Sequence, residues 1–295
     1  MKHRDYVSFS ALGTYNKCPR AYYLKYKEGH EGNPQNTMAR DIGSYAHELF
    51  EVALKGDTGY MQDVLDYWER TEQEHPPHVS TVALDIAKAY LPVLGIGSKI
   101  FPYIHEGKPA IEIEVRRKLQ AGIDFMGYAD AIVTNSKGEN VLIDWKFKTY
   151  LTDKDLVIKD AQLYLYYDSL TRLGVRIDKV LQVQMLNTPP ALPLLKQDGT
   201  FNKKCRKTTR ALFDKACKAY DLTPDEIAQG EKDLESKIKP MTTFMRMVEI
   251  PVGVYTNMML SDFEDGVTRL MEDNFYRRVA SSYACSRCDF KSVCI

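Results

Sequence analysis

The sequence predicts an α/β or α+β core that carries helical insertions. Three observations lead to this fold class. Helical periodicity covers most of the first ninety residues, polar and apolar residues then alternate in short segments, and helices and strands follow in turn after that point. The length of 295 residues suffices for one large domain or two small ones.

Helices dominate the part of the chain that precedes the first expected strand. A loop with Gly32 and Pro34 follows the first of them, and Pro76 with Pro77 separates the last two. The helices are expected at residues 10–27, 38–55, 60–74 and 79–91.

The middle of the chain shows the alternation that is typical of strands. Ile111, Ile113 and Val115 alternate with polar residues, which predicts a half-buried strand. A turn at 135–138 joins two further candidates into a hairpin. The later strands are expected at 125–134, 141–147, 180–186 and 244–254, and the later helices at 157–172, 208–220, 224–239 and 257–279.

Composition excludes several classes of protein. Hydrophobic residues make up 44% and charged residues 27%, so the chain is not disordered throughout. Forty basic and forty acidic residues argue against a strongly basic protein that coats nucleic acid, although a local basic patch is allowed. We expect no membrane-spanning helix and no secretory signal, hence a cytoplasmic protein with reduced thiols.

The strongest local signal is the segment Leu-Ile-Asp-Trp-Lys-Phe-Lys at 142–148. Asp144 and Lys146 share one face of a strand, and Asp130 lies a hairpin's length before them. Two carboxylates brought together across strands suit Mg²⁺ or Mn²⁺, and the lysine can orient water or stabilise charge on a phosphate. By itself, Asp-x-Lys is common and better fits a partly exposed ion pair on an edge strand; with Asp130 the two interpretations become about equal.

Two helical pairs add to this pattern. His47 and Glu51 are four residues apart on one helix face, so the histidine is a candidate metal ligand. Gln162 and Tyr166 are also four apart, on the helix that follows the hairpin. Taken alone, each pair also fits ordinary packing.

Six cysteines are unevenly distributed, and three of them fall within the last eleven residues. Cys285, Cys288 and Cys294 have the spacing C-x2-C-x5-C, and Cys18 beside Pro19 is the natural fourth ligand. In a reduced compartment such a set predicts a metal centre. Spacing alone leaves zinc and iron–sulfur equally open.

The four motifs, in this order, resemble the PD-(D/E)XK nuclease superfamily and its RecB-like branch. They are Gly-Ser-x-x-His (43–47), Gly-x-x-Asp (127–130), Asp-x-Lys (144–146) and Gln-x-x-x-Tyr (162–166). The resemblance implies a restriction-endonuclease-like core with a central mixed sheet. It implies that His47, Asp130, Asp144 and the carbonyl of Trp145 bind metal, that Lys146 is catalytic, and that Gln162 and Tyr166 position DNA.

The cysteine pattern is similar to that of the iron–sulfur nucleases, among them AddB and the CRISPR spacer-acquisition exonucleases. It implies a 4Fe-4S cluster that joins the two ends of one nuclease domain spanning 1–295, with residues 285–294 and Cys18 as its module. Helical insertions are expected at 52–110 and 189–245.

Basic residues that could contact the phosphates of DNA are found after the Asp-x-Lys motif and in a cluster at 203–210. These candidate DNA-binding residues are Lys148, Lys203, Lys204, Arg206, Lys207 and Arg210.

The resemblance implies a metal-dependent exonuclease acting on single-stranded DNA in recombination, repair or replication. The small size and the lack of a helicase module fit a phage or mobile-element gene, hence the cytoplasm of a bacterial or phage-infected cell. The sequence contains no G-x-x-x-x-G-K-S/T nucleotide-binding loop of the kind that helicases use. A helicase, recombinase or integrase would therefore be a separate partner. Two alternatives stay open. One is a nuclease that trims CRISPR spacers for an integrase, and the other is a catalytically weak DNA-binding subunit.

Overall fold

A seven-stranded mixed sheet forms the centre of the computed structural model, which describes all residues except 1–4, 34–36, 57–59, 280–284, 287 and 295. Its strands are β1 (Tyr6–Val7), β2 (Ile100–Pro102), β5 (Ile111–Lys118), β6 (Asp124–Asn135), β7 (Asn140–Lys148), β8 (Lys179–Leu186) and β9 (Met245–Glu249). They run in the order β1-β6-β7-β8-β9, and β2 and β5 also pair with β6. A separate small hairpin joins β3 (Ile104–His105) to β4 (Lys108–Pro109). The predicted α/β arrangement is confirmed.

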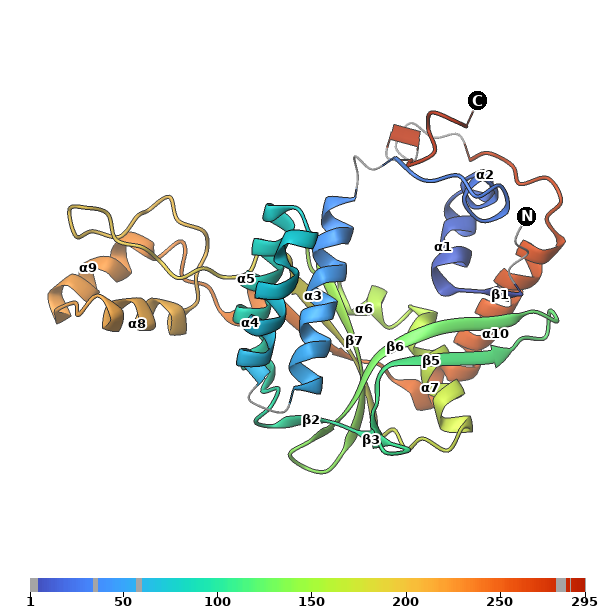
Figure 1. Cartoon of the computed structure of the whole chain (residues 1–295), viewed down its shortest axis with the longest axis horizontal. Coiled ribbons are helices and arrows are strands. Elements are labelled where there is room, and N and C mark those ends of the chain that lie inside the picture. The colour runs from blue at the N-terminus through green and yellow to red at the C-terminus, as the bar shows by residue number, and fades with distance from the viewer. Residues whose placement is uncertain (1–4, 34–36, 57–59, 280–284, 287, 295) are drawn as a thin grey trace.

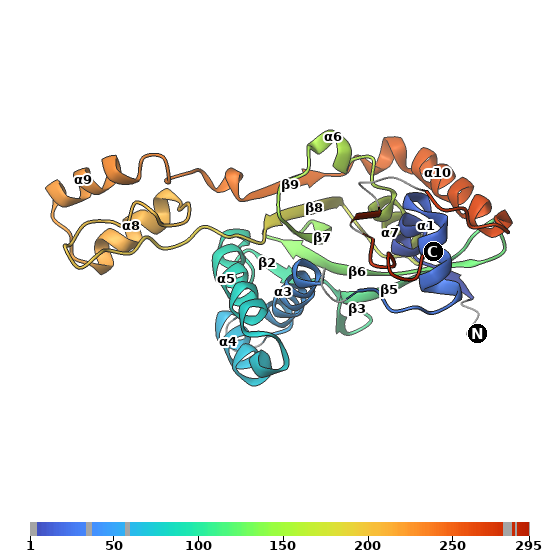
Figure 2. The same ribbon diagram turned by 90° about the horizontal axis from the view of Figure 1, so that it is seen from above.

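Helices cover both faces of this sheet (Figure 2). The layer formed by α3, α4 and α5 packs on one face, and α1, α7 and α10 pack on the other. The helical elements are α1 (Phe9–Lys17), α2 (Pro19–Tyr22), the π-helical η1 (Tyr23–Lys27), α3 (Met38–Lys55), α4 (Tyr60–Thr71), the 3-10 helical η3 (Glu72–Glu74), α5 (Pro77–Leu94), α6 (Lys154–Val157), α7 (Ala161–Arg172), α8 (Arg210–Ala219), α9 (Pro224–Leu234), the 3-10 helical η4 (Met241–Thr243) and α10 (Val252–Glu272).

The predicted hairpin is present as the antiparallel pair β6–β7. Its register pairs Ala131 with Ile143, so the next pair of positions along it brings Asp130 and Asp144 together. Ile143 and Trp145 are buried in the core beneath α3, as the alternation in this strand predicts. Asp144 therefore lies on the opposite face of the sheet, under α7.

Three predicted elements differ from the structure at a proline or an aspartate. The helix expected at 10–27 is interrupted at Cys18, whose backbone is extended because Pro19 disfavours a helical conformation before it. The helix expected at 157–172 is two helices, and the side chain of Asp160 caps the second. The last strand ends at Glu249 and α10 begins at Val252, because Pro251 cannot donate a strand hydrogen bond.

Residues 189–245 leave the sheet and return to it. The arm, which we define as residues 189–240, carries α8 and α9 and projects from the side of the molecule beyond α4 and α5 (Figure 1). It has a small core of its own, centred on Phe201, Phe213 and Leu234. Residues 52–110 contain α4 and α5, but they also supply β2, which the helical periodicity did not predict.

No helix among the residues described is long and apolar enough to cross a membrane.

Candidate metal centre and active site

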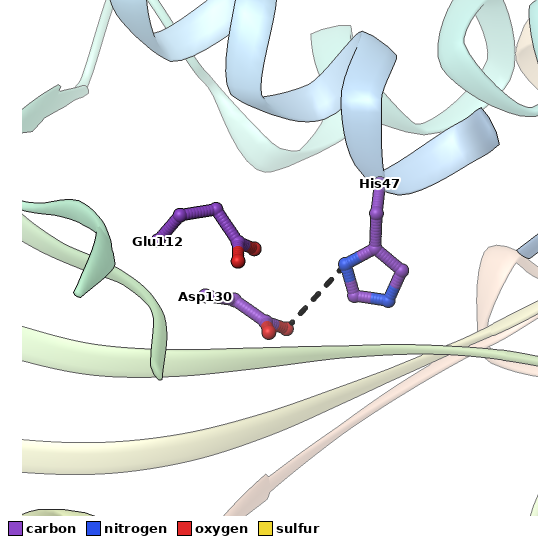
Figure 3. Close-up of side chains that lie close together, drawn as sticks. All are labelled: His47, Glu112 and Asp130. Atoms are coloured by element: carbon purple, nitrogen blue, oxygen red, sulfur yellow. Dashed lines mark ion pairs between the residues drawn. The ribbon is translucent and has the colours of Figure 1, made fainter. Parts of the chain in front are cut away.

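Three elements bring the predicted site residues to one place. His47 lies on α3, Asp130 on β6, and Asp144 and Lys146 on β7. A fifth residue, Glu112 of β5, joins them. His47, Glu112 and Asp130 lie where α3 approaches the strands of the central sheet (Figure 3). Asp144 and Lys146 lie on the side of α7, where Lys146 donates a hydrogen bond to Gln162.

His47, Glu112 and Asp130 are the closest set of metal-ligand side chains in the described part of the chain. Their ligand atoms all lie within 4.8 Å of one another, and Nδ1 of His47 is 3.6 Å from Oδ2 of Asp130. The Trp145 amide donates a 2.6 Å hydrogen bond to the same oxygen of Asp130. One imidazole and two carboxylates are suited to a divalent cation such as Mn²⁺ or Mg²⁺.

Glu112 was not among the residues that the motifs singled out. In the alternating pattern of β5, Glu112 is one of several polar positions. In the structure its φ of 51° lies in the left-handed region, which is unusual for a residue other than glycine. This conformation changes which face the strand presents. Ile111 packs in the core under α3, whereas Ile113 and Val115 face the core under α7. Only this backbone change points to Glu112, and no sequence signal specifies it.

Asp144 and Lys146 form the second half of the site. Nζ of Lys146 donates a 2.8 Å hydrogen bond to Oδ1 of Asp144, whose side chain is 1% exposed. The other oxygen of Asp144, Oδ2, is buried without a hydrogen-bond partner. Buried carboxylate oxygens normally have a hydrogen-bond partner, so an oxygen without one is suited to bind a cation. The residues present thus fit a divalent metal.

A chain of hydrogen bonds leads from Lys146 to α7. Lys146 donates to Gln162 at 3.3 Å, and Gln162 donates to the hydroxyl of Tyr166 at 2.9 Å. The first position of the Gly-x-x-Asp motif requires glycine here, because a Cβ on residue 127 would lie 2.8 Å from the ring and the hydroxyl of Tyr166. The motif residues on β6, β7 and α7 therefore meet, as the sequence predicted.

The charges at the site favour metal binding near neutral pH. Burial, together with the nearby Lys146 ammonium, lowers the pKa of His47 to about 4, which leaves the imidazole neutral. Burial raises the pKa of Asp130 and of Asp144 to about 6 in each case. Partial burial and the carboxylates of Glu51 and Asp130 raise the pKa of Glu112 to about 7. Burial lowers the pKa of Lys146, but Asp144 and Asp130 outweigh it and hold that pKa above its ordinary value.

The four predicted cluster cysteines line one cavity of about 170 Å³. Cys18 comes from the junction of α1 and α2, while Cys285, Cys288 and Cys294 come from the C-terminal tail. Within the described residues, no three of these sulfur atoms lie within 4.8 Å of one another. Cys205 and Cys217 lie on the arm, away from this cavity.

The basic residues expected to bind DNA lie in two places. Lys148 is half-buried at the end of β7, and its ammonium donates to Thr152. The others lie on the arm, and three of them are already paired with carboxylates: Lys203 with Asp233, Arg206 with Asp85 and Arg210 with Glu231. In the described residues no ion pair is found for Lys204 or Lys207. This pairing leaves the arm with less free positive charge than its sequence indicated.

Carboxylates, an imidazole and a lysine on a mixed sheet form a class of site that holds a divalent cation for phosphodiester hydrolysis. A model of the PD-(D/E)XK nuclease superfamily matches residues 6–295. The chain belongs to this superfamily, whose nucleases are metal-dependent phosphodiesterases acting on nucleic acid.

Comparison with curated proteins gives no match. Among solved structures, SSO0001 is similar at 15% identity and a TM-score of 0.39, over 100% of this chain and 87% of that one. A protein from Eubacterium rectale described as a proposed exonuclease is similar at 12% identity and a TM-score of 0.40, over 80% of this chain and 84% of that one. Both likenesses are too distant to assign an activity.

Proposed function

We propose that the chain is a metal-dependent deoxyribonuclease that acts as an exonuclease on single-stranded DNA. The observation that supports this most is the meeting of His47, Asp130, Asp144 and Lys146 from three elements at one site. A subunit that only bound DNA would have no need for this complete set. The sequence alternative of a catalytically weak subunit is therefore less well supported.

His47, Asp130 and Glu112 would hold a divalent cation, with Asp144 Oδ2 and the carbonyl of Trp145 as further ligands. Such a cation, when bound, would polarise the phosphate and lower the pKa of an attacking water. Glu112 replaces no residue of the four motifs. It adds a third carboxylate to the site, and Glu51 lies close enough to affect its charge.

Lys146 acts in this proposal as a cation rather than as a base. Its pKa is held above the ordinary value, so the ammonium keeps its proton at neutral pH. Its position beside Asp144 lets it stabilise the negative charge that develops on the phosphate during attack. Gln162, fixed by Tyr166, holds the lysine in place from the other side.

A direct test is digestion of end-labelled linear single-stranded DNA in Mn²⁺. We expect the wild type to degrade the strand from one end, Asp144→Asn to be inactive, and Asp198→Asn, an exposed change on the arm, to match the wild type. Equal activity in all three would show that the site is misplaced. DNA binding without any cleavage by the wild type would favour the binding-subunit alternative.

We further propose that Cys18, Cys285, Cys288 and Cys294 hold a 4Fe-4S cluster that braces the two chain ends. The cysteines surround one cavity, which fits a shared group. A single zinc ion, with Zn–S bonds of about 2.3 Å, would need the sulfurs about 3.8 Å apart. A 4Fe-4S cluster is larger than one zinc ion, and the resemblance to the iron–sulfur nucleases is what favours it here.

Iron, sulfide and zinc analysis of anaerobically purified protein tests this assignment. Cys18→Ser should remove the iron and the visible absorbance and lower the melting temperature, while Cys205→Ser should leave both unchanged. Stoichiometric zinc with no iron would rule out the cluster. It would leave the nuclease proposal intact, because the two sites share no residue.

A further inference from the structure

The loop that follows the catalytic strand is tied down unusually well for an exposed segment. Residues 149–153 connect β7 to α6, and Thr152 within them has three hydrogen-bond partners from three strands. Its amide donates to Oε1 of Gln184 at 2.7 Å, and its carbonyl accepts from Arg246 at 2.7 Å. Its hydroxyl accepts from Lys148 at 3.0 Å.

These contacts connect the loop to the row of residues that contains Lys146. Lys146 of β7 pairs in register with Gln184 of β8, and Gln184 pairs with Arg246 of β9. Gln184 is fully buried, and its amide nitrogen donates to Gln182 at 3.1 Å. A buried glutamine with both ends satisfied has little freedom, so the loop is fixed relative to the lysine.

One large aromatic side chain on this loop has no partner. Tyr150 is 76% exposed, the most of any tyrosine among the exposed large side chains of the described residues. We find no ring contact, cation contact or hydrogen bond for it in that part of the chain. Single exposed aromatic side chains are common on protein surfaces. Tyr150 stands out because it lies on a fixed loop next to the strand that carries Lys146, and functional residues are often carried on loops held by a rigid scaffold.

The ring lies within reach of a strand bound at the active site. Tyr150 is four positions after Lys146, which limits the distance between their Cα atoms to about 14 Å, the span of a few nucleotides. Single-stranded nucleic acids are bound by aromatic side chains on which bases stack, with cations following the backbone. Lys148 supplies a cation beside the loop, and Arg246 supplies a second one, which lies 3.6 Å from the carboxylate of Asp153 on the same loop.

We propose that Tyr150 is a base-stacking subsite for a nucleotide close to the phosphate that is cleaved, carried on a loop that Thr152 fixes to the sheet. This inference rests on the proposed nuclease function and adds to it the contact that selects a single, unpaired strand. A base within a duplex is already stacked on its neighbours and would not offer its face to the ring.

Fluorescence anisotropy of a labelled oligothymidine, in EDTA and again in Ca²⁺, tests the subsite without relying on turnover. Tyr150→Ala should weaken binding by about 5- to 150-fold, the loss expected for one stacked base. Tyr150→Phe, which keeps the ring, should stay within about twofold of the wild type by the same reasoning. Tyr255→Ala, an exposed tyrosine on α10 away from the arm, is the control.

Oligonucleotides with a single abasic position complete the test. At one position the missing base should weaken wild-type binding but leave Tyr150→Ala unaffected, because the two changes remove the same contact. Unchanged affinity in Tyr150→Ala, or losses that simply add at every position, would overturn the subsite and leave the nuclease proposal standing. A wild type that neither binds nor cleaves DNA would overturn both.

Discussion

Replacing Glu112 by Gln should change the stability of the metal-free protein and its affinity for metal in opposite directions. Glu112, Asp130 and Glu51 place their negative charges close together, and the pKa of Glu112 is raised from 4.5 to about 7 by partial burial and by these neighbours. At pH 8 the carboxylate is ionised, so the metal-free protein carries the cost of this charge. Glutamine keeps the shape and removes that cost.

The size of the effect follows from the shift. At 1.36 kcal/mol per pH unit, the raised pKa corresponds to at most about 3 kcal/mol. Because Glu112 is exposed to solvent, screening reduces this to about 1 kcal/mol. For a chain of this length, that gain raises the melting temperature by about 2 °C.

Metal binding should respond in the opposite sense. Loss of one ligand lowers affinity by roughly tenfold, which removes about 1.4 kcal/mol of metal-induced stabilisation at saturating Mn²⁺. The upward shift in melting temperature on adding Mn²⁺ should therefore shrink by about 3 °C.

Differential scanning calorimetry at pH 8, with EDTA and then with Mn²⁺, measures both effects. Glu114→Gln, an exposed glutamate two residues along the same strand, controls for the change of charge. A Glu112→Gln protein that melts lower in EDTA, or that keeps the full shift in Mn²⁺, would refute the reasoning.

Three further predictions concern Lys146, Gly127 and the two buried aspartates of the proposed site. Lys146→Gln should lower the cleavage rate of end-labelled DNA by about 10²- to 10³-fold, while Mn²⁺ affinity stays equal or becomes tighter because a cation has left; an active variant would contradict the assigned role. Gly127→Ala should destabilise the fold by about 1–3 kcal/mol in urea unfolding, since its Cβ would meet Tyr166, whereas Gly253→Ala, with open space around it, should not. The buried aspartates have pKa values raised to about 6, so protons compete with metal as the pH falls through 6. Affinity for Mn²⁺, titrated by free-ion EPR, should then fall by roughly tenfold or more from pH 7.5 to pH 5, and a flat profile would mean ordinary carboxylates.

Local sequence was sufficient to predict the strand that carries Asp144 and Lys146 and its pairing with β6. Alternation in β7 placed Asp144 and Lys146 on one face, and the turn at 135–138 placed Asp130 beside them; the structure confirms both. The ends of helices were predicted less well. The helix expected at 157–172 is divided, because the side chain of Asp160 caps a second helix that begins at Ala161. A short-range pattern specifies the type of an element more reliably than its ends, because the ends depend on which competing hydrogen bond prevails.

The arm shows the limit of reading charge from sequence. Five basic residues between 203 and 210 predicted a DNA-binding strip, and its role in binding stays a prediction. Carboxylates from α5 and α9, distant in the chain, pair with Arg206, Lys203 and Arg210. Net local charge depends on which segments fold next to each other, and that information is not local.

The sequence by itself determined the superfamily motifs, the strands and helices that carry them, and the cysteines that the two chain ends contribute. Tertiary structure alone decided that Glu112 lies beside His47 and Asp130, that Gly127 must leave room for Tyr166, and that Thr152 ties the loop with an exposed tyrosine to the central sheet. The reason is physical. Periodicity records which face of an element is buried, whereas a left-handed residue within a strand or a buried glutamine joining a loop to a sheet depends on contacts between distant segments.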